Sequence, residues 1–245
     1  LQRLIESEGV TVTAGVPTVW LALLAHLNRT GKTVRSLKRV IVGGSACPQA
    51  IMEEFEREHG VHVHHAWGMT EMSPIGTFNS PSADFDTLSH EEQWAQRLRV
   101  GQPVYGVEVK IVDAAGKELP WDGVSFGALK VRGPWICSEY FRIGKGDAHD
   151  DDGWFETGDV ATVDRRGYVA ITDRTKDVIK SGGEWISSID LENTAVAHPA
   201  VAEAAVIGAY HPRWAERPLL CAVLHPGAQL TREELLAWFE GKVAK

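Results

Sequence analysis

The chain has 245 residues, of which 44% are hydrophobic and 24% charged, and its net charge is −8 at pH 7. That length allows one large domain or one and a half smaller ones. The acidic balance excludes a general attraction to nucleic acid or anionic lipid, and no apolar run approaches the ~20 residues of a membrane-spanning helix. The three cysteines form no CxxC pair, which predicts neither a disulfide framework nor a cysteine zinc site and favours a cytoplasmic location.

The first part of the chain alternates predicted strands with predicted helices. Alternating β-branched residues predict a strand over 10–16, and a proline followed by apolar residues at helical spacing predicts a helix over 17–27. An apolar run that ends in glycines predicts a buried parallel strand over 37–44. A second proline-initiated helix over 48–60 and a strand over 61–67 follow. This order predicts a parallel sheet covered by helices.

The middle of the chain is predicted to be rich in antiparallel strands. Residues 80–98 are polar and are expected to form a surface excursion. Four short strands separated by Gly, Asp and Pro turns then follow, at 105–113, 127–134, 159–164 and 167–173. Short strands joined by tight turns in this way are typical of a small β-barrel.

After a domain boundary placed near Asp173, the pattern returns to mixed helices and strands. Residues 188–198 have a serine cap and a helical pattern. Two strands are predicted over 201–210 and 218–225, and a last helix over 231–241. The whole chain therefore falls in the mixed α/β class.

Two of the predicted strands end in segments that suit a ligand site. The strand over 37–44 runs into two glycines, which allow a ligand to approach the backbone at the carboxyl end of a strand. The next strand ends at Trp67, which can cover a flat ring, and is followed by the hydroxyl of Thr70 and the carboxylate of Glu71, which suit phosphate and Mg²⁺. A tight turn and a capped helix start with a buried tryptophan remain the alternatives.

Other polar residues give weaker signals. Asp159 closes a glycine turn before an apolar strand, where a carboxylate suits the two hydroxyls of a ribose and an ordinary Asx turn is the alternative. His62, His64 and His65 have no cysteine or carboxylate at ligand spacing and are expected to be ordinary polar residues. The sequence contains no GxSxG nucleophile motif and no Walker phosphate loop.

Four motifs in order resemble those of the acyl-adenylate-forming superfamily, and within it most closely those of bacterial fatty-acyl-CoA synthetases. They are HHAWGMTE, GWFETGD, YVAITDR and DRTKDVIKSGGEWISSIDLEN. The resemblance extends over nearly the whole chain, from TVTAGVPTVW onward. The segment SGGEWISSIDLEN favours the CoA-forming branch over luciferases and peptide-synthetase modules.

The resemblance implies the later part of a large αβ domain with a small β-barrel, a hinge, and a partial small α+β C-terminal domain. Residues 1–172 would belong to the large AMP-binding domain, with an αβ subdomain over about 1–99 and a β-rich subdomain over about 100–172. The hinge would cover 173–178, and 179–245 would form the small C-terminal domain, in truncated form.

The resemblance also implies a two-step ligase reaction in fatty acid and lipid metabolism. The carboxylate of a medium- or long-chain fatty acid attacks the α-phosphate of ATP, giving acyl-AMP and pyrophosphate, and the thiol of coenzyme A then displaces AMP. ATP, Mg²⁺ and coenzyme A are the implied cofactors and co-substrates. Such chemistry depends on positioning and charge stabilisation rather than on a protein nucleophile.

The resemblance assigns adenine binding to residues at the ends of the strands predicted over 37–44 and 61–67. Gly44, Ser45 and Ala46 would line one side of the adenine through backbone atoms, and Trp67 would lie on the other side. The family usually has a tyrosine at the position of Trp67. Ring stacking would therefore be kept here, while any hydrogen bond from a phenol would be lost.

The phosphates, the metal and the ribose are assigned to four further residues. Thr70 would contact the α-phosphate, and Glu71 would bind Mg²⁺. Asp159 would hold the ribose hydroxyls, assisted by Arg174. Mg²⁺ and fixed hydrogen-bond donors would offset the repulsion between the nucleotide and an acidic protein.

Five residues after the domain boundary are assigned to the thioester-forming step. Lys176 would be the hinge residue about which the small domain rotates, and Lys180 would approach the site in the thioester-forming state. Gly182 and Gly183 would leave room for the pantetheine arm of coenzyme A. Trp185 would either line that passage or pack under the loop, and packing is the preferred interpretation.

The sequence is expected to be a fragment, since it begins at Leu1 and stops inside a predicted helix. The Ser/Thr/Gly-rich phosphate loop and the C-terminal catalytic lysine of the family would lie outside it, so the chain alone is expected not to adenylate an acid. A non-catalytic nucleotide-binding fragment, or a ligase for another carboxylic acid, is the alternative. The acyl chain length and a homodimer are left open.

Overall fold

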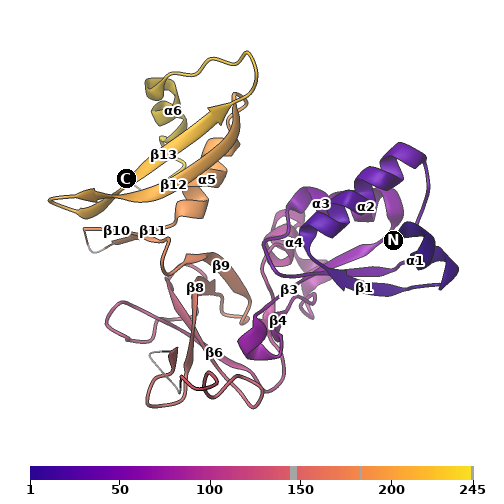
Figure 1. The fold of residues 1–245 in the computed structure, drawn as a ribbon, viewed down its shortest axis with the longest axis horizontal. Helices are drawn as coiled ribbons and strands as arrows, with labels where there is room; N and C mark the ends of the chain where they lie inside the picture. Colours follow the sequence, from indigo (N-terminus) through magenta and orange to yellow (C-terminus); the bar gives the residue numbers. More distant parts are fainter. Residues whose placement is uncertain (144–147, 183, 244–245) are drawn as a thin grey trace. The chain divides into compact units, whose positions relative to one another are not determined.

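Two compact units make up the chain. A computed structural model describes residues 1–143, 148–182 and 184–243. The first unit contains Leu1–Thr157 and Thr162–Ile171, and the second contains Gly158–Ala161 and the chain from Thr172 onward. Figure 1 gives the course of the chain through both. The domain bounds expected from the sequence, including a hinge over 173–178, stay predictions.

The first unit contains a five-stranded sheet in the order β1-β2-β3-β4-β5. Its strands are β1 (Val12–Gly15), β2 (Arg39–Val42), β3 (His62–Gly68), β4 (Ile75–Phe78) and β5 (Gln102–Pro103). The first three pair in parallel, which confirms the predicted order, whereas β4 and β5 are antiparallel to their neighbours. The parallel pairing brings the carboxyl ends of β2 and β3 to one edge of the sheet.

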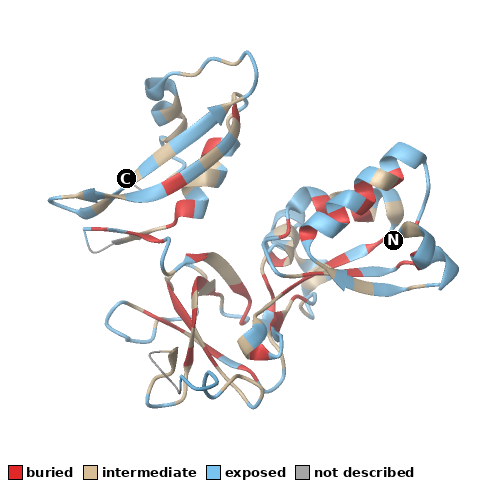
Figure 2. Cartoon of the chain, viewed as in Figure 1, coloured by how far each residue is buried: buried red, intermediate tan, exposed pale blue. Residues whose placement is uncertain are grey.

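Three helices accompany the parallel strands. They are α1 (Gln2–Ser7), α2 (Pro17–Thr30) and α3 (Gln49–His59). α2 ends at Gly31 and α3 at Gly60, both with φ of 64°, a left-handed conformation that commonly terminates helices. Trp20 of α2 packs edge-on against Phe55 of α3, with 6.3 Å between ring centroids. Figure 2 marks such buried residues in red on the helices and strands of this unit.

The polar segment over 80–98 contains a helix that the sequence analysis missed. α4 (His90–Arg97) follows the 3-10 turn η2 (Phe85–Thr87). The Ser89 hydroxyl accepts a hydrogen bond from the Glu92 N–H, and the Glu92 carboxylate accepts one from the Ser89 N–H. The mostly polar residues of α4 hid a helix that this capping box could have predicted.

The predicted β-rich segment forms a four-stranded sheet in the order β6-β7-β8-β9. Its strands are β6 (Glu108–Val112), β7 (Phe126–Arg132), β8 (Phe155–Val163) and β9 (Val169–Arg174). β6 and β7 are antiparallel, with Glu108 opposite Arg132. Ile111, Leu129 and Phe155 are among its buried apolar residues. The four predicted strands are therefore confirmed.

The second unit contains a four-stranded sheet in the order β11-β10-β13-β12 and two helices. Its elements are β10 (Ile179–Ser181), β11 (Glu184–Ile186), α5 (Ser188–Val196), β12 (Val201–His211), β13 (Ala215–Leu224) and α6 (Arg232–Phe239). The Ser187 hydroxyl caps α5 by accepting from the Asp190 N–H, and Thr231 forms a capping box with Glu234 at α6. These elements confirm the predicted helices and strands, and with them the mixed α/β class.

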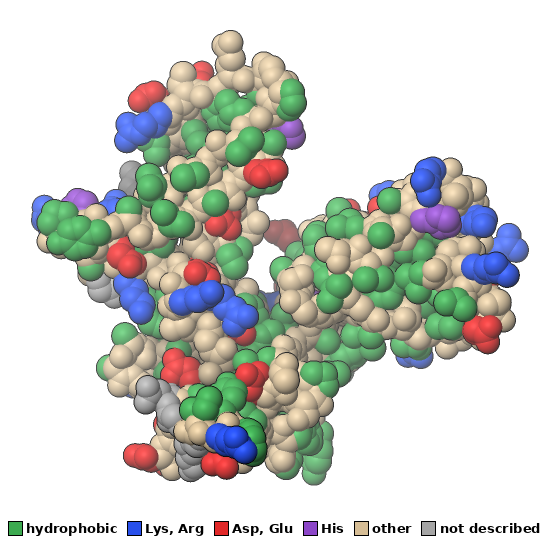
Figure 3. All heavy atoms as spheres, viewed as in Figure 1, with side chains coloured by type: hydrophobic (Ala, Val, Ile, Leu, Met, Phe, Trp, Pro, Cys, Tyr) green, Lys and Arg blue, Asp and Glu red, His purple; other side chains and the backbone are tan. Residues whose placement is uncertain are grey.

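The surface face in Figure 3 carries acidic and basic side chains interspersed with hydrophobic ones. Across the described residues, no helix combines the length and the hydropathy needed to cross a bilayer. The cysteines are free thiols: Cys47 is buried, Cys137 partly buried and Cys221 exposed. Burial raises the pKa of Cys47 to about 11, so this thiol keeps its proton at neutral pH.

Candidate active site

The turn after β2 brings backbone groups to the edge of the parallel sheet. Gly44 has a φ of 84°, a left-handed conformation that favours glycine. A Cβ on Gly43 would lie 3.2 Å from the carbonyl oxygen of Ala66, so the turn passes close to β3. Gly44, Ser45 and Ala46 are all exposed. These three residues are therefore accessible at the end of β2, and their contact with adenine stays a prediction.

His65 of β3 is the side chain that contacts this turn. It is 4% exposed, and its Nε2 lies 3.4 Å from the backbone oxygen of Ser45. A carbonyl oxygen only accepts, so Nε2 carries the proton and donates. Burial lowers the pKa of His65, which favours the neutral ring. The expectation of an ordinary polar histidine missed this contact, because only the pairing of β2 with β3 creates it.

Trp67 lies near the end of β3 and is half-buried. It pairs with Thr77 of β4. A Cβ on Gly76 would lie 2.8 Å from Cζ3 of Trp67, so the glycine allows the indole ring to lie close to the β4 backbone. A ring fixed in this way can present a flat face to a ligand ring. Stacking of adenine on Trp67 stays a prediction.

Thr70 and Glu71 begin the 3-10 helix η1 (Thr70–Met72), directly after β3. Thr70 is exposed, and the partly buried Glu71 accepts a hydrogen bond of 2.9 Å from the Tyr140 hydroxyl. The carboxylate of Glu71 suits Mg²⁺, which is commonly held by one or two carboxylates, water and substrate phosphates. The described part of the chain has no group of three or more His, Cys, Asp or Glu side chains placed to hold a metal. Glu71 therefore fits a metal that arrives with the nucleotide.

Asp159 and Arg174 form an ion pair in the second unit. Oδ1 of Asp159, whose side chain is 8% exposed, lies 2.9 Å from Nη1 of Arg174, which is 55% exposed. Arg174 and Lys176 line a hollow of about 330 Å³, together with Gly158 and Thr175. The structure thus brings the predicted ribose-binding pair and the predicted hinge lysine to one place. A buried carboxylate oriented by an arginine is suited to accept hydrogen bonds from paired hydroxyls.

The β10–β11 hairpin carries the residues predicted to serve coenzyme A. Nζ of Lys180 lies 5.8 Å from the ring centroid of Trp185 on the paired strand, within cation–π range. Gly182 has a φ of 62°, and a Cβ there would lie 2.8 Å from the Trp214 ring. Packing and backbone conformation therefore account for Gly182, and its role toward coenzyme A stays a prediction. Gly183 lies outside the described residues.

Comparison with known proteins identifies the family. Residues 1–141, more than half of the chain, match the AMP-binding enzyme family, and residues 190–245 match the AMP-binding enzyme C-terminal domain. The chain belongs to the AMP-binding enzyme family. The resemblance inferred from the four motifs is therefore confirmed.

Relatives of this chain include named CoA ligases. The chain is 54% identical to a 3-methylmercaptopropionyl-CoA ligase of Ruegeria lacuscaerulensis and 52% identical to a medium-chain-fatty-acid–CoA ligase of Ectopseudomonas oleovorans. Each match covers 100% of this chain and 45% of the relative, so the chain spans about half the length of these relatives. Among solved structures, o-succinylbenzoate coenzyme A synthetase (MenE) of Bacillus subtilis, in complex with ATP and magnesium, matches with a TM-score of 0.76 and 29% identity. That match covers 99% of this chain and 47% of MenE.

Asp173 was not among the predicted site residues. It is 2% exposed, and its Oδ2 accepts hydrogen bonds from the Ser188 N–H at 2.6 Å and the Ser188 hydroxyl at 3.0 Å. It thereby ties the end of β9 to the first turn of α5, where a negative charge is favoured by the helix dipole. The only signal in the sequence was an acidic residue some 15 positions before a serine-capped helix.

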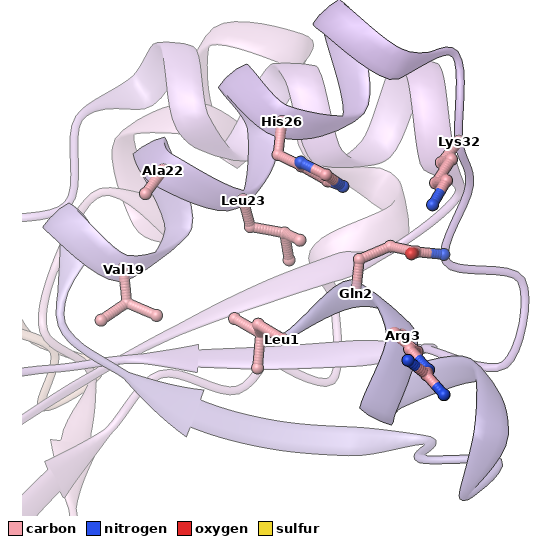
Figure 4. A pocket seen from close by; sticks show the side chains of 8 residues that line it. All are labelled: Leu1, Gln2, Arg3, Val19, Ala22, Leu23, His26 and Lys32. Atoms are coloured by element: carbon pink, nitrogen blue, oxygen red, sulfur yellow. The ribbon is translucent and has the colours of Figure 1, made fainter.

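A further hollow of about 490 Å³ lies beside α1 and α2 of the first unit (Figure 4). Its lining is mostly apolar, with His26 and Lys32 at one side and Leu1 and Val19 at the other (Figure 4). No predicted site residue lines it. The predicted nucleotide residues lie instead at the β2 and β3 ends and around the Asp159 ion pair, each set within its own unit.

Proposed function

We propose that this chain is part of an ATP-dependent acid–CoA ligase, which forms acyl-AMP and then acyl-CoA. One observation carries the proposal: Gly44 and the Thr70–Glu71 pair follow neighbouring parallel strands, β2 and β3, at the same sheet edge. Ligands of open α/β sheets bind at such an edge. The names of the relatives, which are CoA ligases, support the reaction class.

In the first step of the proposed reaction, the protein positions ATP and stabilises charge. Gly44, Ser45 and Ala46 would contact one face of adenine, and Trp67 would stack on the other. Thr70 would donate a hydrogen bond to the α-phosphate. Fixed donors of this kind stabilise charge that develops on phosphate oxygens in the transition state.

The metal and the ribose complete the nucleotide site. Glu71 would hold Mg²⁺, which supplies positive charge against the phosphates when it is bound with ATP. Asp159 would accept hydrogen bonds from the ribose hydroxyls, and its ion pair with Arg174 holds the carboxylate in place. The structure of MenE in complex with ATP and a magnesium ion supports ATP and Mg²⁺ as the ligands of the proposed site.

The second step is assigned to the proposed hinge, residues 173–178, and to the β10–β11 hairpin. Lys176 would be the residue about which the small domain turns, and its side chain is exposed, as a residue that changes its surroundings requires. Lys180 would approach the acyl-AMP in the thioester-forming state. Gly182, Gly183 and Trp185 would flank the pantetheine arm of coenzyme A.

A medium- or long-chain fatty acid is the proposed acyl substrate, with a short sulfur-containing acid as the second candidate. The relatives at 54% and 52% identity are named for one of each kind. The segment from Gly68 to Phe78 would line part of the acyl site, but Met72, Gly76 and Thr77 in it are already buried within the first unit. A substrate panel is therefore the direct test.

The test of the proposed function uses the complete protein that contains this chain. CoA thioester formation would be followed by mass spectrometry with 3-methylmercaptopropionate and with fatty acids of increasing length. ATP-dependent thioester formation with at least one acid is expected. Lack of thioester with every acid, while ATP is still bound, would favour the alternative of a nucleotide-binding protein without ligase activity.

Asp159→Ala supplies the matching site test in the same protein. Loss of a hydrogen bond to a charged group typically costs about 1.5–3 kcal/mol, so the apparent affinity for ATP should fall by that amount. Asp177→Ala is the control, because Asp177 is an exposed carboxylate in the turn that follows β9. Equal ATP affinity of the Asp159→Ala variant and the wild type would remove Asp159 from the site.

A further inference from the structure

The segment over residues 135–140, which follows β7, is fixed against the turn that carries Glu71. The Cys137 N–H donates to the Glu71 backbone oxygen at 2.7 Å, and the Ser73 hydroxyl donates to the Trp135 backbone oxygen at 3.1 Å. The Trp135 indole N–H donates to the Ile75 backbone oxygen at 3.4 Å. Three hydrogen bonds between segments about sixty residues apart therefore hold this segment beside η1.

Tyr140, at the end of this segment, contacts the functional end of Glu71. Its hydroxyl donates to Oε1 of Glu71 at 2.9 Å, a normal length for a hydrogen bond to a carboxylate. A carboxylate has about four acceptor sites on two oxygens, so one phenol leaves capacity for a cation. The bond fixes the rotation of a side chain that is only partly buried.

The 135–140 segment contacts Glu71 through both a backbone group and a side chain. The backbone of the 135–140 segment is anchored to the backbone of Glu71 by Cys137, and the side chain of Tyr140 then returns to the side chain of the same glutamate. The two contacts act on one residue at two points. They set the position of the Glu71 main chain and the orientation of its carboxylate separately.

We infer that Tyr140 is a positioning residue that orients the Glu71 carboxylate toward the Mg²⁺ of bound MgATP. The inference rests on the proposed function, and it adds to it a residue from a different part of the chain. Mg²⁺ demands near-octahedral geometry at short distances, so the orientation of a single protein carboxylate matters. Partners that orient a metal-binding side chain typically change metal affinity or activity by ~10–100-fold when removed.

Tyr140→Phe in the complete protein is the test, because it removes the hydroxyl and keeps the ring. ATP binding would be measured by calorimetry with and without Mg²⁺, in the absence of acid and coenzyme A. We expect the strengthening of ATP binding by Mg²⁺ to fall by roughly tenfold, the lower end for such partners, while metal-free ATP binds as in the wild type. A purely structural role of Tyr140 would change both affinities alike.

Two variants provide the comparison. Tyr105→Phe is the matched control, since Tyr105 is 99% exposed, and it should behave like the wild type. Glu71→Gln should abolish most of the Mg²⁺ effect, and adding Tyr140→Phe to it should have no further effect, because the hydroxyl then has no carboxylate to orient.

The outcomes separate this inference from the proposed function. An unchanged Mg²⁺ effect in Tyr140→Phe, with the effect lost in Glu71→Gln, would overturn the inference alone. An Mg²⁺ effect that survives Glu71→Gln would also overturn it, because Glu71 would then not hold the metal. A wild-type protein that binds no ATP would overturn the proposed function and this inference with it.

Discussion

The two regions that carry the predicted site residues are held in place by different physical means. In the strand-end region, residues 43–46 and 67–76, close backbone approach fixes the turns, and Gly68 and Gly76 are needed for it. In the region over residues 172–188, which contains the proposed hinge, the buried carboxylate of Asp173 fixes the chain at α5. A single side chain added to the first region, or a single charge removed from the second, should therefore lower the free energy of unfolding most.

This difference fits the roles proposed for the two regions. A nucleotide site gains from rigid backbone donors, which cost no reorganisation when charge develops. A joint about which a domain turns needs a backbone free to change at a few positions, between well-fixed ends. Asp173 is buried at one end of the proposed hinge, while Lys176 and Asp177 beyond it are exposed.

Gly68→Ala is the strongest way to break the strand-end region. A Cβ on Gly68 would overlap the carbonyl oxygen of Pro74 and lie 3.0 Å from the Gly76 nitrogen. Since both obstacles are backbone atoms, we expect the free energy of unfolding to fall by about 3 kcal/mol, the upper part of the usual range for overpacking. Urea unfolding followed by tryptophan fluorescence would measure it.

Gly60→Ala is the control for that substitution. Gly60 has a φ of 64°, but a Cβ there would meet nothing within 4 Å, so only the left-handed conformation is penalised, at about 1 kcal/mol. Equal losses for the two variants would mean that β3 and β4 separate easily, and that close approach does not hold this region.

Asp173→Asn is the corresponding destabilising substitution in the region over residues 172–188. The amide keeps the size of the side chain but loses the charge that accepts from the Ser188 N–H and hydroxyl. We expect a loss of about 2 kcal/mol in the free energy of unfolding of the second unit, typical of a hydrogen bond to a charged group. Asp177→Asn, at an exposed carboxylate of the same segment, should change it by less than about 0.5 kcal/mol.

Amide hydrogen exchange at α5 would report the Asp173→Asn effect locally. Faster exchange at the first turn of α5, with little change in β1, β2 and β3, is the expected pattern. Protection of α5 that stays at the wild-type level would show that the carboxylate does not hold this end of the joint.

His65→Gln tests the smallest effect, a pH-dependent one in the strand-end region. Burial lowers the pKa of His65 in the folded protein, and the unfolded value is about 6.5. The stability gained by keeping this ring neutral is fully present above about pH 6.5 and is lost as the pH falls through the lower folded value. The wild type should therefore lose more stability than His65→Gln as the pH falls below about 6.5.

Thermal unfolding at a series of pH values would measure this difference, with His62→Gln as the control. His62 lies on the same strand but is exposed. If the wild type and His65→Gln were to show the same pH dependence, the buried ring would not be the group that responds to acid.

Local sequence signals predicted most elements, because their physical causes are local. Pro17 begins α2, and left-handed glycines end both α2 and α3. The Gly, Asp and Pro turns between short segments predicted the strands of the β-rich segment. α4 was missed where polar residues masked the helical pattern, even though Ser89 and Glu92 formed a readable cap.

The sequence by itself predicted most of the strands and helices, the family motifs, and ligand-facing segments at Gly44 and at Thr70–Glu71. These depend on hydrophobic period, proline and glycine conformations, and residue types close together in the chain. Only the tertiary structure decided which distant groups meet: His65 with Ser45, Tyr140 with Glu71, and Asp173 with Ser188. The physical reason is that such contacts depend on strand pairing and loop packing between segments 15 to 69 residues apart, and no local pattern records them.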